Sequence, residues 1–262
     1  KNSKGDFIMN ILFTVCGRAG SKGIKGKNFR KFLGVPLLYY TVAAIELYKE
    51  MHSENRIDIA LNTDSVDMVR LIERIDLGIS CIDRKEELAG DYVAKIDVIR
   101  DTWQTMCTEN HMEYDAVIDC DITSPLRTVQ DIENLIKKYT EGKYDIVYSV
   151  TNARRNPYFN MVTIDEEGFS HVVIKSDFVA RQQAPVIYDM NASLYAYTPA
   201  FLEANKCAKD AHNGVIFMKD TAVLDLDNEG DFELMQIIAE YLVSRDDNMR
   251  KIFLRAKEIL NT

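Results

Sequence analysis

Cysteine, histidine and long apolar runs are all scarce in this 262-residue chain. Its five cysteines are an odd number without metal-type spacing, and none of its four histidines has a partner at metal-site or triad spacing. These absences argue against a disulfide framework and against histidine-based chemistry, and they indicate a reducing cytoplasm. The apolar run 7–16 is too short to span a bilayer. We therefore expect a cytoplasmic protein without a membrane partner.

Positive charge is also in deficit, but unevenly. Lys and Arg number 32 against 41 Asp and Glu, a net charge of −9, which argues against a nucleic-acid partner. Residues 17–31 nevertheless carry six basic side chains, four glycines and no acidic residue. Glycines let a backbone approach phosphate oxygens, and Lys and Arg neutralise their charge. The segment indicates anion binding, although a solvated basic loop without a ligand is the plainer alternative.

Alternating patterns place this loop in a fold. Short apolar β-branched runs occur at 11–15, 57–61, 78–82, 116–118 and 146–150, and stretches of helical period lie between them at 37–48, 65–75, 94–106 and from a Thr128–Asp131 capping pair onward. Runs that are apolar throughout are typical of strands covered on both faces. The pattern predicts a doubly wound, mostly parallel α/β sheet whose ligands bind at the carboxyl ends of the strands.

The pattern changes after residue 150. Segments 158–164 and 171–174 flank a turn at 165–168 and predict a β-hairpin inserted in the core. Strands at 192–198 and 223–226 and helices at 231–243 and 248–260 are expected to complete the fold. We expect residues 7–262 to form a single domain with an excursion at about 151–190.

The glycine spacing at positions 17, 20, 23 and 26 matches neither a Walker A loop nor a dinucleotide fingerprint. Instead, Arg18-Ala-Gly-Ser-Lys22 with Lys27-Asn28 resembles the signature of the CMP-sialic acid synthetases, or acylneuraminate cytidylyltransferases. Four later segments resemble the same family in the same order: Arg84 with Leu88-Ala-Gly-Asp91, Thr123-Ser-Pro-Leu-Arg127, Arg181-Gln-Gln183 leading to Asn191-Ala-Ser-Leu-Tyr195, and Leu224-Asp-Leu-Asp227.

The resemblance implies a Rossmann-like nucleotide-diphospho-sugar transferase fold, with the excursion as a dimerisation hairpin in a homodimer. It implies transfer of CMP from CTP to the anomeric hydroxyl of a nonulosonic acid, with release of pyrophosphate. The triphosphate would be held by Arg18, Gly20, Ser21, Lys22, Lys27 and Asn28, with Arg18 and Lys27 stabilising the reacting phosphates. The cytidine pocket would be lined by Arg84, Asp91, Thr123 and Ser124, and the sugar by Arg181, Gln182, Gln183 and Asn191.

Asp225 and Asp227 flank one residue at a predicted strand end, so alternation sends both carboxylates to the same side. Two oxygen ligands beside a triphosphate suit Mg²⁺, although a solvated turn explains the pair equally well without the resemblance. Asp227 is also the candidate acceptor of the proton from the attacking hydroxyl. Asp121 departs from the sialate pattern and resembles the octulosonate cytidylyltransferases, where an Asp here is a metal ligand. Asp121 is therefore a further Mg²⁺ candidate, unless it caps the turn or hydrogen-bonds the base.

Other departures concern the substrates. Asp189 and Tyr158-Phe159 stand where the sialate enzymes tend to carry basic residues, which suggests legionaminic or another modified nonulosonic acid. Lys95 replaces a small residue near the expected base pocket, which leaves the strictness for CTP open. The alternatives are an octulosonate-type cytidylyltransferase and a non-catalytic nucleotide-binding scaffold of the same fold.

Overall fold

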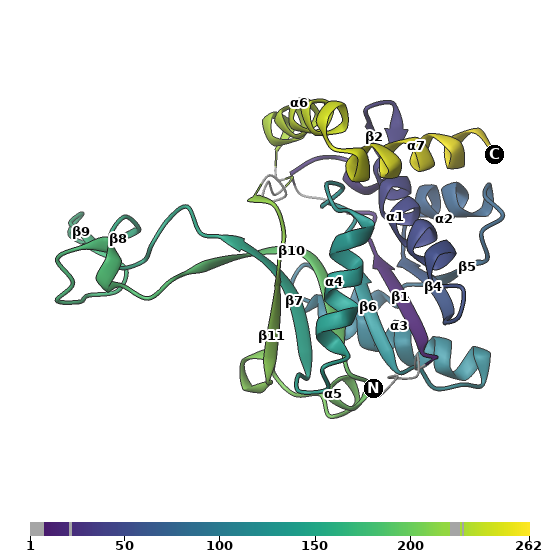
Figure 1. Ribbon diagram of the computed structural model, residues 1–262, viewed down its shortest axis with the longest axis horizontal. Coiled ribbons are helices and arrows are strands. Elements are labelled where there is room, and N and C mark those ends of the chain that lie inside the picture. Colours follow the sequence, from purple (N-terminus) through teal and green to yellow (C-terminus); the bar gives the residue numbers. More distant parts are fainter. Residues whose placement is uncertain (1–7, 21–22, 221–225, 227) are drawn as a thin grey trace, which may run out of the picture.

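A single seven-stranded sheet organises the chain, in the order β11-β7-β10-β6-β1-β4-β5 (Figure 1). The structure is a computed structural model that describes residues 8–20, 23–220, 226 and 228–262. β10 runs antiparallel to β6 and β7, whereas the remaining neighbours are parallel. The strands are β1 (Asn10–Cys16), β4 (Arg56–Thr63), β5 (Ile79–Asp83), β6 (Ala116–Cys120), β7 (Ile146–Asn152), β10 (Tyr188–Tyr197) and β11 (Asn213–Phe217).

Helices cover both faces of the sheet, so the doubly wound prediction is confirmed. One face packs under α1, α2, α4, α6 and α7, and the other under α3 and α5. Strand β1 shows why its run is apolar throughout: Ile11 and Phe13 join the first core cluster, while Leu12 joins the second. The helices are α1 (Leu37–Met51), α2 (Val66–Glu73), α3 (Lys95–Asn110), α4 (Val129–Tyr139), α5 (Pro199–Glu203), α6 (Glu229–Arg245) and α7 (Asp247–Asn261).

The predicted capping pair at the start of α4 is confirmed. Thr128 Oγ1 accepts the Asp131 backbone N–H, and the Asp131 carboxylate accepts the Thr128 N–H at 2.8 Å. Asn228 and Asp231 make the same reciprocal pair in front of α6. The pair places the start of α6 at Glu229, two residues before the expected 231.

The excursion after β7 leaves the body of the molecule as an extended arm (Figure 1). Its tip is the expected hairpin, β8 (Val162–Ile164) paired with β9 (Ser170–Val172). The first strand is shorter than predicted because Asn156 Oδ1 accepts the Tyr158 N–H at 2.9 Å and turns the chain before residue 161. The strands that carry the arm, β7 and β10, both belong to the central sheet.

Two expectations at the sheet's end differ from the structure. Strand β11 was not predicted, because its sequence Asn-Gly-Val-Ile-Phe is short. The structure shows it half exposed and paired in parallel with β7. Of the strand expected at 223–226, residues 223–225 lie outside the described residues, and Leu226 is buried but not in a strand. No helix among the described residues is long and apolar enough to cross a membrane.

Candidate functional site

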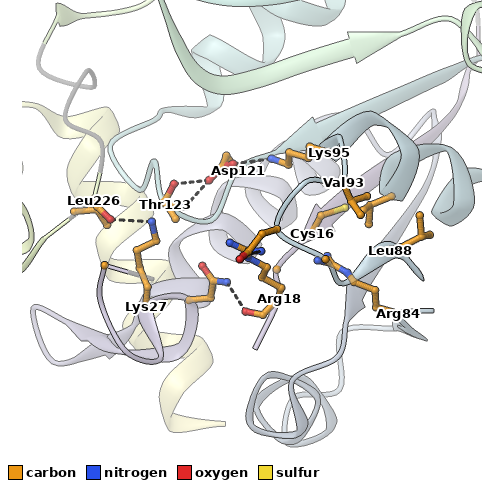
Figure 2. A pocket seen from close by; sticks show the side chains of 16 residues that line it. Cys16, Arg18, Lys27, Arg84, Leu88, Val93, Lys95, Asp121, Thr123 and Leu226 are labelled. Carbon is orange, nitrogen blue, oxygen red and sulfur yellow. Dashed lines mark hydrogen bonds and ion pairs between the residues drawn. The ribbon is translucent and has the colours of Figure 1, made fainter. Parts of the chain in front are cut away.

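The loops that follow β1, β5 and β6 surround a cavity of about 430 Å³ at the carboxyl edge of the parallel strands (Figure 2). This is the edge at which the topology predicts ligand binding. The backbone N–H of Gly17 donates to the Asn62 carbonyl at 3.2 Å, which extends the β1–β4 pairing into the glycine loop. The predicted site residues that line the cavity are Arg18, Lys27, Asn28, Arg84, Asp91, Asp121 and Thr123.

The described residues of the glycine loop, 17–20 and 23–31, make several contacts with the rest of the chain. Gly26 takes a left-handed conformation (φ 65°) that starts a single 3-10 turn over Lys27–Phe29. The turn directs Lys27 Nζ to the Leu226 carbonyl at 2.8 Å and Asn28 Nδ2 to the Arg18 carbonyl at 3.3 Å. The Ala19 N–H donates to Asp64 Oδ1 at 2.7 Å. The loop is therefore a built wall of the cavity, which argues against the solvated-loop alternative.

Three predicted phosphate-site residues of the loop lie away from the cavity wall or outside the described part. Gly20 is exposed and does not line the cavity, and Ser21 and Lys22 lie outside the described residues. Gly17, by contrast, is packed so closely that a Cβ would lie 2.6 Å from Met68 Cε and 2.9 Å from Ile122 Cδ1. The requirement for glycine is thus steric at position 17.

Arg18 reaches across the cavity to Asp91. Its Nη1 lies 2.6 Å from Asp91 Oδ1, and the two side chains are 33% and 40% exposed. The ion pair joins the glycine loop to the segment that follows β5 and holds the guanidinium at the cavity surface. The Arg18 guanidinium is therefore accessible to an anion that enters the cavity.

The opposite wall combines a buried arginine with apolar side chains. Arg84 is 8% exposed, and it donates from Nε to Asn62 Oδ1 at 3.0 Å and from Nη2 to the Asn62 carbonyl at 2.8 Å. Leu88, Val93 and Val98 line the cavity beside it. Apolar side chains next to a fixed cation suit a nucleobase better than a phosphate.

The floor of the cavity is a charged cluster of Lys95, Asp119 and Asp121. Lys95 Nζ lies 2.7 Å from Asp119 Oδ2 and 2.6 Å from Asp121 Oδ2. Burial disfavours both charged forms, but the attraction outweighs it: the pKa of Asp121 falls to about 2, and that of Lys95 rises well above its usual value. Burial beside Asp119 raises the pKa of the neighbouring Cys16 thiol to about 12, so Cys16 is no nucleophile at neutral pH.

The segment after β6 is held from below by a fully buried arginine. Arg127 donates to the Asp121 and Ser124 carbonyls, the latter at 2.8 Å from Nη2. Asp121 Oδ1 accepts the Thr123 N–H at 2.7 Å and its hydroxyl at 2.6 Å, which places Thr123 on the cavity wall. Ser124, predicted to face the nucleotide, is instead buried beside the cavity and does not line it.

The expected metal ligands are not assembled within the described residues. Asp225 and Asp227 lie outside them, and the described ranges contain no group of three or more His, Cys, Asp or Glu side chains arranged for a metal. Each oxygen of Asp121 already has a partner, Lys95 for Oδ2 and Thr123 for Oδ1. Asp121 therefore does not fit a metal ligand in this arrangement.

The predicted sugar residues lie apart from this cavity. Arg181 and Gln182 line a smaller one of about 250 Å³ at the base of the arm, together with Arg155. Gln183 Oε1 accepts the N–H groups of Val179 and Ala180, so it caps the local turn. Asn191 is buried in the bulged part of β10, where its Oδ1 accepts the Ser149 hydroxyl at 2.5 Å. Within one chain, these residues do not join the nucleotide cavity.

A further cavity, of about 640 Å³, was missed at the level of sequence. It lies on the face of β7 and β10 that α3 and α5 cover, beside the first turn of α3, and its wall carries Tyr148, Tyr195 and Tyr197. Tyr195 pairs in register with Asp119, so only the end of β6 and the start of α3 separate the two cavities. No sequence signal marks this cavity, because its tyrosines come from strands that pair only in the tertiary structure. For Asp119, alternation with Asp121 was the available signal.

Comparisons with known proteins agree with this geometry. The family model for cytidylyltransferases matches residues 12–240. The post-translational flagellin modification protein B of Campylobacter coli is 32% identical over 94% of this chain and 100% of its own length. The CMP-N,N'-diacetyllegionaminic acid synthase of Campylobacter jejuni is 33% identical over 90% of this chain and 96% of its own length.

Solved structures show the same fold at low identity. A CMP:2-keto-3-deoxy-manno-octonic acid synthetase complexed with CTP has a TM-score of 0.61 at 11% identity, covering 88% of this chain and 99% of that one. The 4-diphosphocytidyl-2C-methyl-D-erythritol synthase of Anaerococcus prevotii has a TM-score of 0.55 at 14% identity with the same coverage. The Rossmann-like nucleotidyltransferase fold and the matched family model together lead to one assignment: the chain belongs to the cytidylyltransferase family and is a nucleotidyltransferase.

Proposed function

We propose that the protein transfers CMP from CTP to the anomeric hydroxyl of a nonulosonic acid and releases pyrophosphate. The observation that carries the proposal is the cavity of about 430 Å³ that Arg18, Lys27 and Arg84 all line. Phosphate-binding cations on one wall and an apolar slot with a buried arginine on the other match the two halves of a nucleotide. The relatives named for legionaminic acid and other nonulosonic acids support the choice of acceptor.

The chain's own residues have defined tasks in this reaction. The anomeric oxygen forms a bond to the α-phosphorus, and the bond from that phosphorus to the bridging oxygen breaks, so that pyrophosphate leaves. Arg18 and Lys27 would stabilise the charge that grows on the α-phosphate and the leaving group, a role worth about 10²–10³ in rate for one well-placed donor. The hydroxyl proton is assigned to Asp227. Gly20, Ser21, Lys22 and Asn28 would complete the phosphate site.

Mg²⁺ is the proposed cofactor, with Asp225 and Asp227 as its protein ligands. When bound, Mg²⁺ would neutralise triphosphate charge and polarise the reacting phosphate. Lys27 donates to the carbonyl of Leu226 at 2.8 Å, and in the sequence Leu226 stands between these two carboxylates. Asp121 is left out of the ligand set because Lys95 and Thr123 already occupy its oxygens.

For the sugar acid, we propose the residues at the base of the arm, where Arg155 and Arg181 line a cavity and offer cations for a carboxylate. Arg181, Gln182, Gln183 and Asn191 keep their proposed sugar role, with the arm residues supplied across a dimer. N,N'-diacetyllegionaminic acid is the preferred candidate, because the relative named for it shares 33% identity.

A homodimer is proposed from the arm. Ile164 and Phe169 are 72% and 62% exposed at its tip, and Val179 is 89% exposed further along. Such apolar exposure on a projecting hairpin is typical of an interface. Replacing Ile164 and Phe169 by Asp should convert a dimer to a monomer in light scattering; a wild-type monomer would contradict the proposal. Cytoplasmic location stays a proposal, supported by the free state of all five cysteines.

Pyrophosphate release tests the function. The protein is supplied with Mg²⁺ and CTP, ATP, GTP or UTP, and with sialic, legionaminic, pseudaminic or octulosonic acid. We expect turnover with CTP and a legionaminic acid above all other pairs. Turnover with the octulosonic acid alone would favour the octulosonate-type alternative, and CTP binding without turnover on any acid would favour a non-catalytic scaffold.

A further inference from the structure

We propose that Lys95 is the resident cation of the Asp119–Asp121 carboxylate pair, and that Asp121 is a positioning residue for the nucleotide wall and not a metal ligand. The role of Lys95 as the cation of the carboxylate pair concerns only the chain itself. The role of Asp121 in positioning the nucleotide wall for CTP rests on the proposed function.

The two carboxylates face the same side because they are two residues apart, Asp119 in β6 and Asp121 directly after its last residue. Asp119 is fully buried, so its charge requires a partner inside the protein. Lys95, the first residue of α3, places Nζ at 2.7 Å from Asp119 and 2.6 Å from Asp121. One ammonium thus sits between two carboxylates at the point where a divalent cation would otherwise bridge them.

The remaining oxygens of the pair are also engaged. Asp119 Oδ1 accepts the Thr14 hydroxyl at 3.0 Å, and Asp121 Oδ1 accepts the N–H and hydroxyl of Thr123. A divalent ion at Asp121 would have to share these oxygens with their present donors while standing next to a lysine ammonium. Mg²⁺ requires near-octahedral oxygen ligands and gives up its waters reluctantly, so it competes poorly for such a site.

Lys95 also connects two walls of the nucleotide cavity. It belongs to the wall that contains Arg84 and Val93, while Asp121 and Thr123 lie in the segment that follows β6 (Figure 2). The contacts run from Lys95 to Asp121 and from Asp121 to Thr123, and the side chains of Lys95, Asp121 and Thr123 all line the cavity. Loss of the ion pair should therefore loosen nucleotide binding more than it slows the chemical step.

Mn²⁺ binding followed by electron paramagnetic resonance separates the two roles of Asp121. In the CTP complex without sugar acid, Asp121→Asn should leave the Mn²⁺ affinity within about twofold of wild type. A loss of tenfold or more would overturn the proposal. Asp227→Asn is the comparison; if it loses no Mn²⁺ affinity, the metal assignment of the proposed function fails while the role of Lys95 stands.

Mn²⁺ binding to the nucleotide-free protein provides an independent test. Lys95→Met removes the resident cation, so it should gain one Mn²⁺ site that wild type lacks. Lys95→Met combined with Asp121→Asn should lose that site again, and Lys95→Arg should restore the wild-type behaviour. The matched control is Lys85→Met, which breaks another Lys–Asp pair, with Asp101, but leaves a single carboxylate and should gain no site. A Mn²⁺ site in nucleotide-free wild type that Asp121→Asn abolishes would overturn the proposal.

Steady-state kinetics test the positioning role. Asp121→Asn should raise the KM for CTP about tenfold and change kcat less than threefold, and Lys95→Arg should recover most of the affinity that Lys95→Met loses. If Asp121→Asn lowered kcat and left KM unchanged, Asp121 would act in the chemical step and the positioning role would be wrong. The side chain of the Asp121→Asn variant can still accept hydrogen bonds from Thr123. The tests that use this variant therefore remain valid even if Lys95→Met fails to fold.

Discussion

Replacing Arg18 by alanine should separate catalysis from stability more sharply than any other single change. Its guanidinium forms an ion pair with Asp91 in which both side chains are about a third or more exposed. Exposed ion pairs contribute roughly 0–1 kcal/mol to stability. Because about 1 kcal/mol corresponds to roughly 2–4 °C in a domain of this size, we expect Tm to fall by no more than that.

The kinetic cost should be much larger. If the guanidinium stabilises charge on the reacting phosphates, its loss removes an interaction that strengthens in the transition state, worth about 2.7–4 kcal/mol, or about 10²–10³ in kcat. The same cation also binds the ground-state triphosphate, so the KM for CTP should rise as well. The fall in kcat is what distinguishes a transition-state role from simple binding.

The assay is continuous detection of pyrophosphate at saturating sugar acid, with thermal unfolding of the same samples. Lys31→Ala is the control, because Lys31 is an exposed cation just after the same loop and does not line the cavity; it should match wild type in both measurements. An Arg18→Ala enzyme with unchanged kcat would refute the catalytic assignment. A Tm loss well beyond 4 °C would show that Arg18 supports the fold.

Three further changes probe the floor and walls of the cavity. The pKa of Asp121 lies near 2 in the fold, because Lys95 and Thr123 outweigh the effect of burial, against 3.8 ordinarily; its ionised form therefore stabilises the fold above pH 4, and this stability is lost as pH falls toward 2. Asp121→Asn should cost about 2 kcal/mol at pH 7 and nothing near pH 2, as measured by urea unfolding across pH; a pH-independent cost would contradict this. Arg127→Met should destabilise by about 2–4 kcal/mol in the same assay, because it removes the donors to two buried carbonyls; a cost below about 1 kcal/mol would contradict it. Gly17→Ala should cost about 1–3 kcal/mol by overpacking against Met68, and it should weaken CTP binding in calorimetry by displacing Asn28, whose Nδ2 would lie 3.0 Å from the new Cβ; unchanged CTP affinity would show that the glycine is not needed for the nucleotide.

Local patterns were sufficient to predict most of the elements. The apolar run at Ile11–Val15 reads as a doubly covered strand because alternate side chains enter opposite cores, and the Thr128–Asp131 pair marks a helix start because both partners lie within one turn. The concentration of cations and glycines before Lys31 singled out a segment that lines the cavity, because the residues that build it are close in sequence. Strand β11 and the length of the arm's first strand escaped prediction, because pairing with β7 and the Asn156 turn decide them.

The sequence by itself thus determined the alternation of strands and helices, the family and the basic glycine loop, all of which depend on residues within a few positions of one another. Only the tertiary structure decided what Asp121 contacts. It brings Lys95 from the start of α3 onto a carboxylate pair at the end of β6, and it lays tyrosines from β7 and β10 along a cavity beside them. Charge pairing and burial depend on distances across the sheet, which spacing along the chain does not encode.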